Sequence, residues 1–114
     1  MVKEGRVYTL GTMGDLFCLD VAKGKPIWSK NLRDEYKAPT QTWGFSAHPL
    51  LDGERLICIV GGKAGACAAF HKHTGKEIWR ALAGDTAGYC PPMIYEIAGK
   101  RQLIIWDPNA VHSL

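Results

Sequence analysis

A segment of this chain occurs twice at a fixed distance. Residues 24–28 read Gly-Lys-Pro-Ile-Trp and residues 75–79 read Gly-Lys-Glu-Ile-Trp, which is an offset of 51 positions. The same offset relates Gly11 to Gly62, and a partial third copy, residues 103–114, fits at an offset of 44. A period of about 40–50 residues is typical of propeller blades or of paired-helix repeats. The repeat therefore restricts the chain to a repeat architecture.

The apolar runs favour strands over helices. They are short, β-branched and aromatic, and clusters of the thirteen glycines and six prolines separate them. Asp52-Gly53, between two such runs, predicts a tight hairpin turn. We expect strands at about 6–10, 16–20, 26–31, 45–51, 55–60, 66–71, 77–82, 89–97, 102–106 and 110–114. Four strands in each unit is what a propeller blade needs.

We therefore predict an all-β fold, a β-propeller of four-stranded antiparallel blades. Residues 1–31 form a partial blade, residues 45–82 a full blade and residues 88–114 a second partial blade. These 114 residues have the size of one ordinary domain. Propellers rarely close with fewer than about four blades, so we expect a partial chain of about two and a half blades. Open blade flanks would favour self-association.

Composition and charge exclude several classes of protein. The net charge is 14 − 11 = +3, and no run contains more than two adjacent basic residues, so no nucleic-acid partner is expected. No apolar stretch approaches the roughly 18–20 residues of a membrane span. With 46% hydrophobic and 22% charged residues, the chain has the composition of a packed globular protein.

The repeated segments resemble a known motif. Residues 18–28 and 69–79 are similar to the tryptophan-docking motif of pyrroloquinoline-quinone (PQQ)-like repeats, A-L-D-x-x-T-G-K-x-x-W. Cys18, Lys23 and His71 depart from the Ala, Thr and Asp of that motif. The resemblance implies an eight-bladed propeller, shared by quinoprotein alcohol dehydrogenases and by BamB-like outer-membrane assembly lipoproteins. It also implies a periplasmic or otherwise extracytoplasmic location.

Two residue types recur in this docking motif, glycine and tryptophan. A tryptophan at one fixed place in each blade can pack into the face of the next blade and bury about 150–250 Å² of ring surface. The other interpretation is an aromatic binding platform. We favour the structural role, because binding residues have no reason to recur in every blade. The residues concerned are Gly24, Trp28, Gly75 and Trp79.

A candidate ligand-binding face follows from the blade order. The innermost strands are expected within 45–51 and 89–95, and the loops that enter them crowd one face of the disc, where loops on a rigid scaffold carry function. An ordinary propeller face capped by aromatic residues is the alternative. The channel-face candidates are Trp43, Lys63, Tyr89, Trp106 and Asp107.

Two functions are compatible with this reading. The first is a non-catalytic extracytoplasmic segment that acts as a scaffold or binds proteins or peptides, similar to BamB-like proteins. The alternative is part of a PQQ- and Ca²⁺-dependent quinoprotein dehydrogenase that oxidises an alcohol or sugar. Calcium needs hard oxygen ligands, and the predicted inner strands offer no Glu–Asn–Asp set. The sequence therefore identifies no catalytic residue, no cofactor-binding residue and no metal ligand.

The remaining candidates are cysteines and a polar loop. The four cysteines form no CxxC pair, so a zinc site is not expected. Cys58 and Cys67 flank a glycine-rich turn, where they would form either a cross-strand disulfide or two small buried thiols. Residues 31–40 are expected to form a polar inter-blade loop, either solvated or in contact with a partner.

Overall fold

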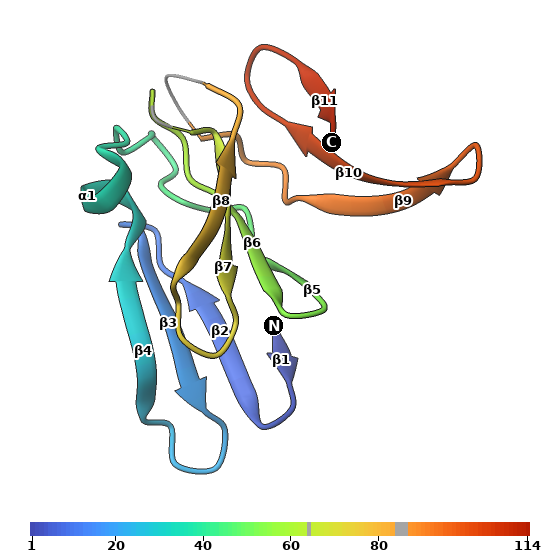
Figure 1. The fold of residues 1–114 in the computed structure, drawn as a ribbon. Coiled ribbons are helices and arrows are strands. Elements are labelled where there is room, and N and C mark those ends of the chain that lie inside the picture. The colour runs from blue at the N-terminus through green and yellow to red at the C-terminus, as the bar shows by residue number, and fades with distance from the viewer. Residues whose placement is uncertain (64, 84–86) are drawn as a thin grey trace.

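The chain folds into three antiparallel sheets that follow one another along the sequence (Figure 1). The structure is a computed structural model and describes residues 1–63, 65–83 and 87–114. Blade 1 contains β1 (Val2–Lys3), β2 (Arg6–Leu10), β3 (Asp15–Asp20) and β4 (Pro26–Asn31). Blade 2 contains β5 (Leu50–Asp52), β6 (Arg55–Ile59), β7 (Cys67–His71) and β8 (Glu77–Ala81). Blade 3 contains β9 (Met93–Ile97), β10 (Lys100–Trp106) and β11 (Val111–Ser113).

This arrangement confirms the predicted all-β fold of four-stranded antiparallel blades. Within blades 1 and 2 the strands pair in chain order, and the third sheet has the order β11-β10-β9. The sheets span residues 2–31, 50–81 and 93–113. That they are part of an eight-bladed ring stays a prediction.

The strand pairing makes blades 1 and 2 equivalent residue by residue. Trp28 lies opposite Cys18 in blade 1, as Trp79 lies opposite Ala69 in blade 2. Both ladders then shift register at the next residue, so each blade has its irregularity at the same place. The first pairs of the β2–β3 and β6–β7 ladders, Arg6↔Asp20 and Arg55↔His71, also correspond.

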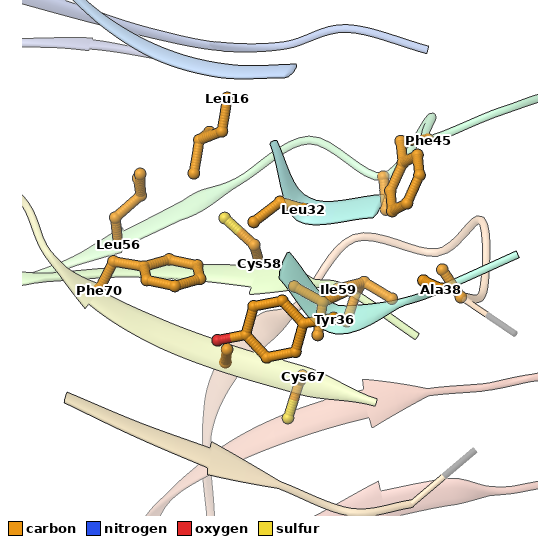
Figure 2. Close-up of a cluster of buried hydrophobic side chains, with 14 of the residues drawn as sticks. Leu16, Leu32, Tyr36, Ala38, Phe45, Leu56, Cys58, Ile59, Cys67 and Phe70 are labelled. Carbon is orange, nitrogen blue, oxygen red and sulfur yellow. The ribbon is translucent and has the colours of Figure 1, made fainter. Parts of the chain in front are cut away.

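The core lies between the blades and is densest in blade 2. Four of the five residues of β6 and four of the five of β7 are buried, on both faces of the sheet. In β2 only Tyr8 is buried, and in β9 no residue is more than partly buried. Blade 2 is covered by a neighbour on each flank, whereas the outer blades are covered on one. Figure 2 shows Leu16, Leu32, Leu56, Phe70 and their neighbours in this cluster.

The prediction of a polar loop over residues 31–40 is wrong. Residues 32–36 form a short helix, α1 (Leu32–Tyr36), with Leu32 fully buried and Tyr36 4% exposed. Asn31 caps it, because its Oδ1 accepts a hydrogen bond from the backbone N–H of Asp34 at 2.9 Å. The helix therefore contributes two apolar side chains to the core.

Two predicted inner strands are shorter than expected. The strand predicted at 45–51 begins only at Leu50, and that predicted at 89–97 begins only at Met93. Each start follows proline, at Pro49 and at Pro92. Proline has no N–H to donate to a ladder, so pairing begins after it.

The Cys58–Cys67 hairpin geometry also differs from the prediction. Cys58 pairs with Ala68 and Cys67 with Ile59, so the two cysteines are offset by one residue. Side chains one position apart in register point to opposite faces of a sheet. Both thiols are free and buried, and burial raises the pKa of Cys67 to about 11. The alternative of two buried thiols describes the structure.

Candidate functional site

The seam between blades 1 and 2 is built around Trp28. Its indole Nε1 donates to the backbone carbonyl of Lys72 at 2.9 Å, and the hydroxyl of Tyr8 donates to the same carbonyl at 3.0 Å. A Cβ placed on Gly75 would lie 2.6 Å from the Trp28 ring. Glycine is thus required at position 75, both for the ring contact and for its φ of +74°.

Charged groups close this seam at one end. The buried ammonium of Lys72 lies 2.9 Å from an oxygen of Glu4 and 3.4 Å from an oxygen of Glu54. The hydrogen bond from Lys72 lowers the pKa of Glu4, and the pKa of Lys72 is raised in return. Arg6 Nη1 donates to Nδ1 of His73 at 2.5 Å. Because arginine has no acceptor, Nδ1 of His73 is the acceptor in this contact.

The channel-face candidates separate into two groups. Tyr89, Trp106 and Asp107 come together in one cleft of about 340 Å³. The other residues that line this aromatic cleft are Gly88, Cys90 and Pro108. Tyr89 is 44% exposed and Trp106 is 56% exposed, so both rings remain accessible to a ligand.

The backbone of the aromatic cleft is fixed by a close approach. A Cβ on Gly88 would lie 2.5 Å from the carbonyl oxygen of Trp106, a distance that no side chain permits. The segment before β9 therefore lies directly on the end of β10. This places Tyr89 beside Trp106, although the two are 17 residues apart in the sequence.

Asp107 is engaged within its own turn. Its Oδ1 accepts from the backbone N–H groups of Asn109 at 2.7 Å and Ala110 at 2.8 Å. Its Oδ2 lies 2.7 Å from Nε2 of His112. The backbone hydrogen bond from Asn109 is the main cause of the lowered pKa of Asp107. The carboxylate orders the β10–β11 turn, and the lining of the cleft is otherwise apolar and aromatic.

Trp43 and Lys63 lie outside the lining of the aromatic cleft. Trp43 is 74% exposed, in the segment between α1 and β5. The next residue, Gly44, packs so closely on Thr12 of blade 1 that a Cβ would lie 2.5 Å from its carbonyl oxygen. Lys63 is exposed in the turn between β6 and β7. The structure thus unites three of the five candidates.

A second cleft, between blades 2 and 3, was not predicted from the sequence. It has a volume of about 220 Å³, and Trp79, Ile57, Ile94 and Leu103 contribute apolar walls. The remaining residues of this lining are Asp52, Arg55, Arg101 and Leu114. The equivalence of Arg55 to Arg6 and of Trp79 to Trp28 is the signal in the repeat that points to it.

An ion pair across the blades closes one side of this second cleft. Two guanidinium nitrogens of Arg101 on β10 lie 2.5 and 3.2 Å from the carboxylate of Asp52 on β5. This bidentate contact is the main cause of the lowered pKa of Asp52. It joins β10 of blade 3 to β5 of blade 2.

Among residues 1–63, 65–83 and 87–114, no three His, Cys, Asp or Glu side chains lie close enough together to hold a metal ion. Within the same residues, no helix has the length and apolar character needed to cross a membrane.

Comparison with known proteins agrees with the repeat. The sequence model of a PQQ-repeat family described as outer membrane protein assembly factor BamB matches residues 1–108. A quinohemoprotein alcohol dehydrogenase of Comamonas testosteroni is 30% identical over 112 residues, which is 93% of this chain and 15% of that protein. The crystal structure of a quinohemoprotein alcohol dehydrogenase from the same organism matches with a TM-score of 0.54 at 28% identity, over 68% of this chain and 12% of that one. The resemblance predicted from the docking motifs is confirmed.

Proposed function

Because this chain belongs to the PQQ-type β-propeller family of outer membrane protein assembly factor BamB, we propose that it is a non-catalytic scaffold that binds a protein partner. The partner contacts the aromatic cleft formed by Tyr89, Cys90, Trp106 and Pro108. The chain covers 15% of the dehydrogenase to which it is similar, so this proposal concerns the blades present in the sequence.

The observation that carries this proposal is the chemistry of the aromatic cleft. Two accessible aromatic rings line it, and the one carboxylate in the part of its lining that the structure describes, Asp107, is already bound by two backbone N–H groups and His112. Tyrosine and tryptophan are enriched among the residues that dominate binding energy in protein interfaces. An apolar side chain of a partner can fill such a cleft without displacing a charged group.

Site-specific photo-crosslinking in cells tests the proposal. A photoreactive phenylalanine analogue replaces Trp106 in one variant and Lys23, in the distant β3–β4 turn, in a matched control. We expect a discrete crosslinked protein with the probe at position 106, lost when Tyr89→Ala is added, and none with the probe at position 23. Identical crosslinking patterns from the two positions would contradict a binding role for the cleft.

The extracytoplasmic location is part of the same proposal. It is supported by the family description, which names an outer membrane assembly factor. Fractionation of cells that express the full-length protein tests it: we expect the protein in the periplasmic or envelope fraction, and recovery with cytoplasmic markers would contradict it.

A quinoprotein dehydrogenase is the second candidate, favoured by the similarity to the quinohemoprotein alcohol dehydrogenase. Within residues 1–63, 65–83 and 87–114, no set of side chains matches the oxygen ligands that the calcium ion of the quinone needs. Among the described residues that line the aromatic cleft, the carboxylate is that of Asp107, which is already bound within its own turn, and the same described residues provide no cluster of three ligating side chains. Addition of PQQ, Ca²⁺ and a dye acceptor to the full-length protein separates the two candidates. Reduction of the dye in the presence of an alcohol or sugar would establish the dehydrogenase.

A further inference from the structure

Five ionisable side chains meet at one end of the seam between blades 1 and 2. Blade 1 contributes Glu4 from the β1–β2 turn and Arg6 from β2. Blade 2 contributes Glu54 from the β5–β6 turn, and Lys72 and His73 from the β7–β8 turn. The two cations and the two carboxylates cancel one another, so the balance of charge depends on His73. Histidine is the side chain that ordinarily changes charge between about pH 5 and pH 8.

The ring of His73 contacts one group of each blade. Its Nδ1 accepts from Nη1 of Arg6, in blade 1, at 2.5 Å. Its Nε2 lies 3.5 Å from a carboxylate oxygen of Glu54, in blade 2, and its side chain is 35% exposed, so the ring can exchange protons with solvent. The first contact joins the two blades, whereas the second lies within blade 2.

Protonation of His73 is incompatible with the contact between the blades. An imidazolium carries a hydrogen on both nitrogens and has no acceptor, and a guanidinium has no acceptor either. A proton on Nδ1 would therefore place two positively charged donors against each other. At Nε2 the same positive charge strengthens the attraction to Glu54. Protonation thus exchanges a contact between blades for a contact within one blade.

We propose that His73 is a pH-sensitive switch between blades 1 and 2, bound to Arg6 when its ring is neutral and released to Glu54 when the ring is protonated. The rest of the seam stays in place. Lys72 keeps its contact with Glu4, whose pKa this hydrogen bond lowers, and Trp28 keeps its bond to the Lys72 carbonyl. Acid therefore loosens one corner of an assembled seam. The switch shares no residue with the aromatic cleft, so it does not depend on the function proposed above.

A second imidazole lies next to His73. The backbone N–H of His73 donates to Nδ1 of His71 at 3.3 Å, and the two ring centroids are 5.6 Å apart. The strands and turns next to the cluster also carry Lys3, Tyr8, Asp20, Arg55 and Lys76. None of these other residue types ordinarily changes charge between about pH 5 and pH 8. The effect of His71 is therefore the one that an experiment must separate from that of His73.

A double-mutant cycle measured at two pH values tests the switch. Arg6→Met and His73→Phe are made singly and together, and denaturant unfolding of the full chain gives the coupling between the two positions. We expect a coupling of about threefold to tenfold in the unfolding constant at about pH 8, as for one hydrogen bond, and none at about pH 5.5, where histidine is ordinarily protonated. His73→Asn keeps an acceptor at the δ position that does not titrate, so its coupling to Arg6 should be the same at both pH values. The cycle of Glu54→Gln with His73→Phe should show the opposite trend and give its larger coupling in acid.

The matched control is His71→Phe, whose cycle with Arg6→Met should show no coupling that depends on pH. Persistence of the Arg6–His73 coupling at about pH 5.5 would overturn the proposal, and so would its absence at about pH 8. Nitrogen-15 NMR of the imidazole rings in the unmodified chain gives a second measurement that needs no substitution. We expect His73 to carry its proton on Nε2 alone at the higher pH and on both nitrogens at the lower. A proton on Nδ1 at the higher pH would contradict the switch even if a variant fails to fold.

Discussion

A single glycine shows how closely the two blades fit. Gly75 has a φ of +74° and its Cβ position falls within 2.6 Å of the Trp28 ring, whereas Gly24 has a φ of +65° and nothing within 4 Å of its Cβ position. The two glycines occupy the same place in the repeat. Gly75 allows both the turn and the contact with Trp28, whereas Gly24 allows only the turn.

Alanine substitution separates these two contributions. Gly24→Ala should cost about 1–2 kcal/mol, the usual penalty of a left-handed conformation for an L-residue. Gly75→Ala should cost a further 1–3 kcal/mol or so, because the new methyl group displaces the Trp28 ring. Denaturant unfolding measures both. Equal losses of stability would mean that the Trp28 contact contributes nothing.

Asp107 predicts a pH dependence of stability. Its lowered pKa means that the ionised form is favoured in the folded chain, so its contribution is complete at a pH above the ordinary value of about 4 and is lost as the pH falls through the depressed value. Asp107→Asn should therefore destabilise the chain at neutral pH by about 1–3 kcal/mol, as for a disrupted buried hydrogen-bonding group. The loss should shrink as the pH approaches 2. Thermal melts across the acid range measure it, and a loss independent of pH would contradict this role.

At the scale of elements, the secondary structure of the repeated segments was predicted more accurately than that of the segments between them. Strands β2, β3, β6 and β7 lie close to their predicted ranges, because a short β-branched and aromatic run between glycine turns is a local pattern. The helix α1 was missed because Asn-Leu-Arg-Asp-Glu-Tyr is mostly polar, and its two buried side chains, Leu32 and Tyr36, become apparent only once the blades are packed. The cap residue Asn31 before Asp34 was the local signal available.

The candidate site was predicted only in part for a similar reason. Tyr89, Trp106 and Asp107 meet because Gly88 lies on the end of β10, an approach that depends on the closing of blade 3 on itself. Trp43 is placed elsewhere, because its neighbour Gly44 packs closely on Thr12 of blade 1. Loop position along the chain identifies a face of the molecule, whereas tertiary contacts decide which residues share a cleft.

The cap of α1 can be tested directly. Asn31 accepts from Asp34 N–H and also donates from Nδ2 to the carboxylate of Asp15 at 2.7 Å, so it joins the helix to the start of β3. Asn31→Ala should cost about 1–2 kcal/mol. Asn31→Ser keeps a capping oxygen and should recover part of this loss. If serine and alanine give the same unfolding free energy, the cap is not what holds the helix.

At the scale of the whole molecule, blade 2 is covered on both flanks and blade 3 on one. Side chains of β9, β10 and β11 alternate between two faces. Ile94, Leu103 and Arg101 line the second cleft on the face toward blade 2. The other face carries Tyr95, 52% exposed, and Val111, 58% exposed. An apolar sheet face of this kind is a surface for association.

We therefore expect the chain to self-associate through the outer face of blade 3. Sedimentation velocity over a wide range of protein concentration should show a weight-average mass that rises with concentration. The double variant Tyr95→Lys and Val111→Lys places two charges on this face and should shift the chain toward monomer, because each charge would have to be desolvated at an interface. A matched double variant, Thr40→Lys and Thr42→Lys, adds the same charge to the exposed segment before β5 and should leave the association unchanged. An equal shift from both double variants would attribute the effect to net charge rather than to this face.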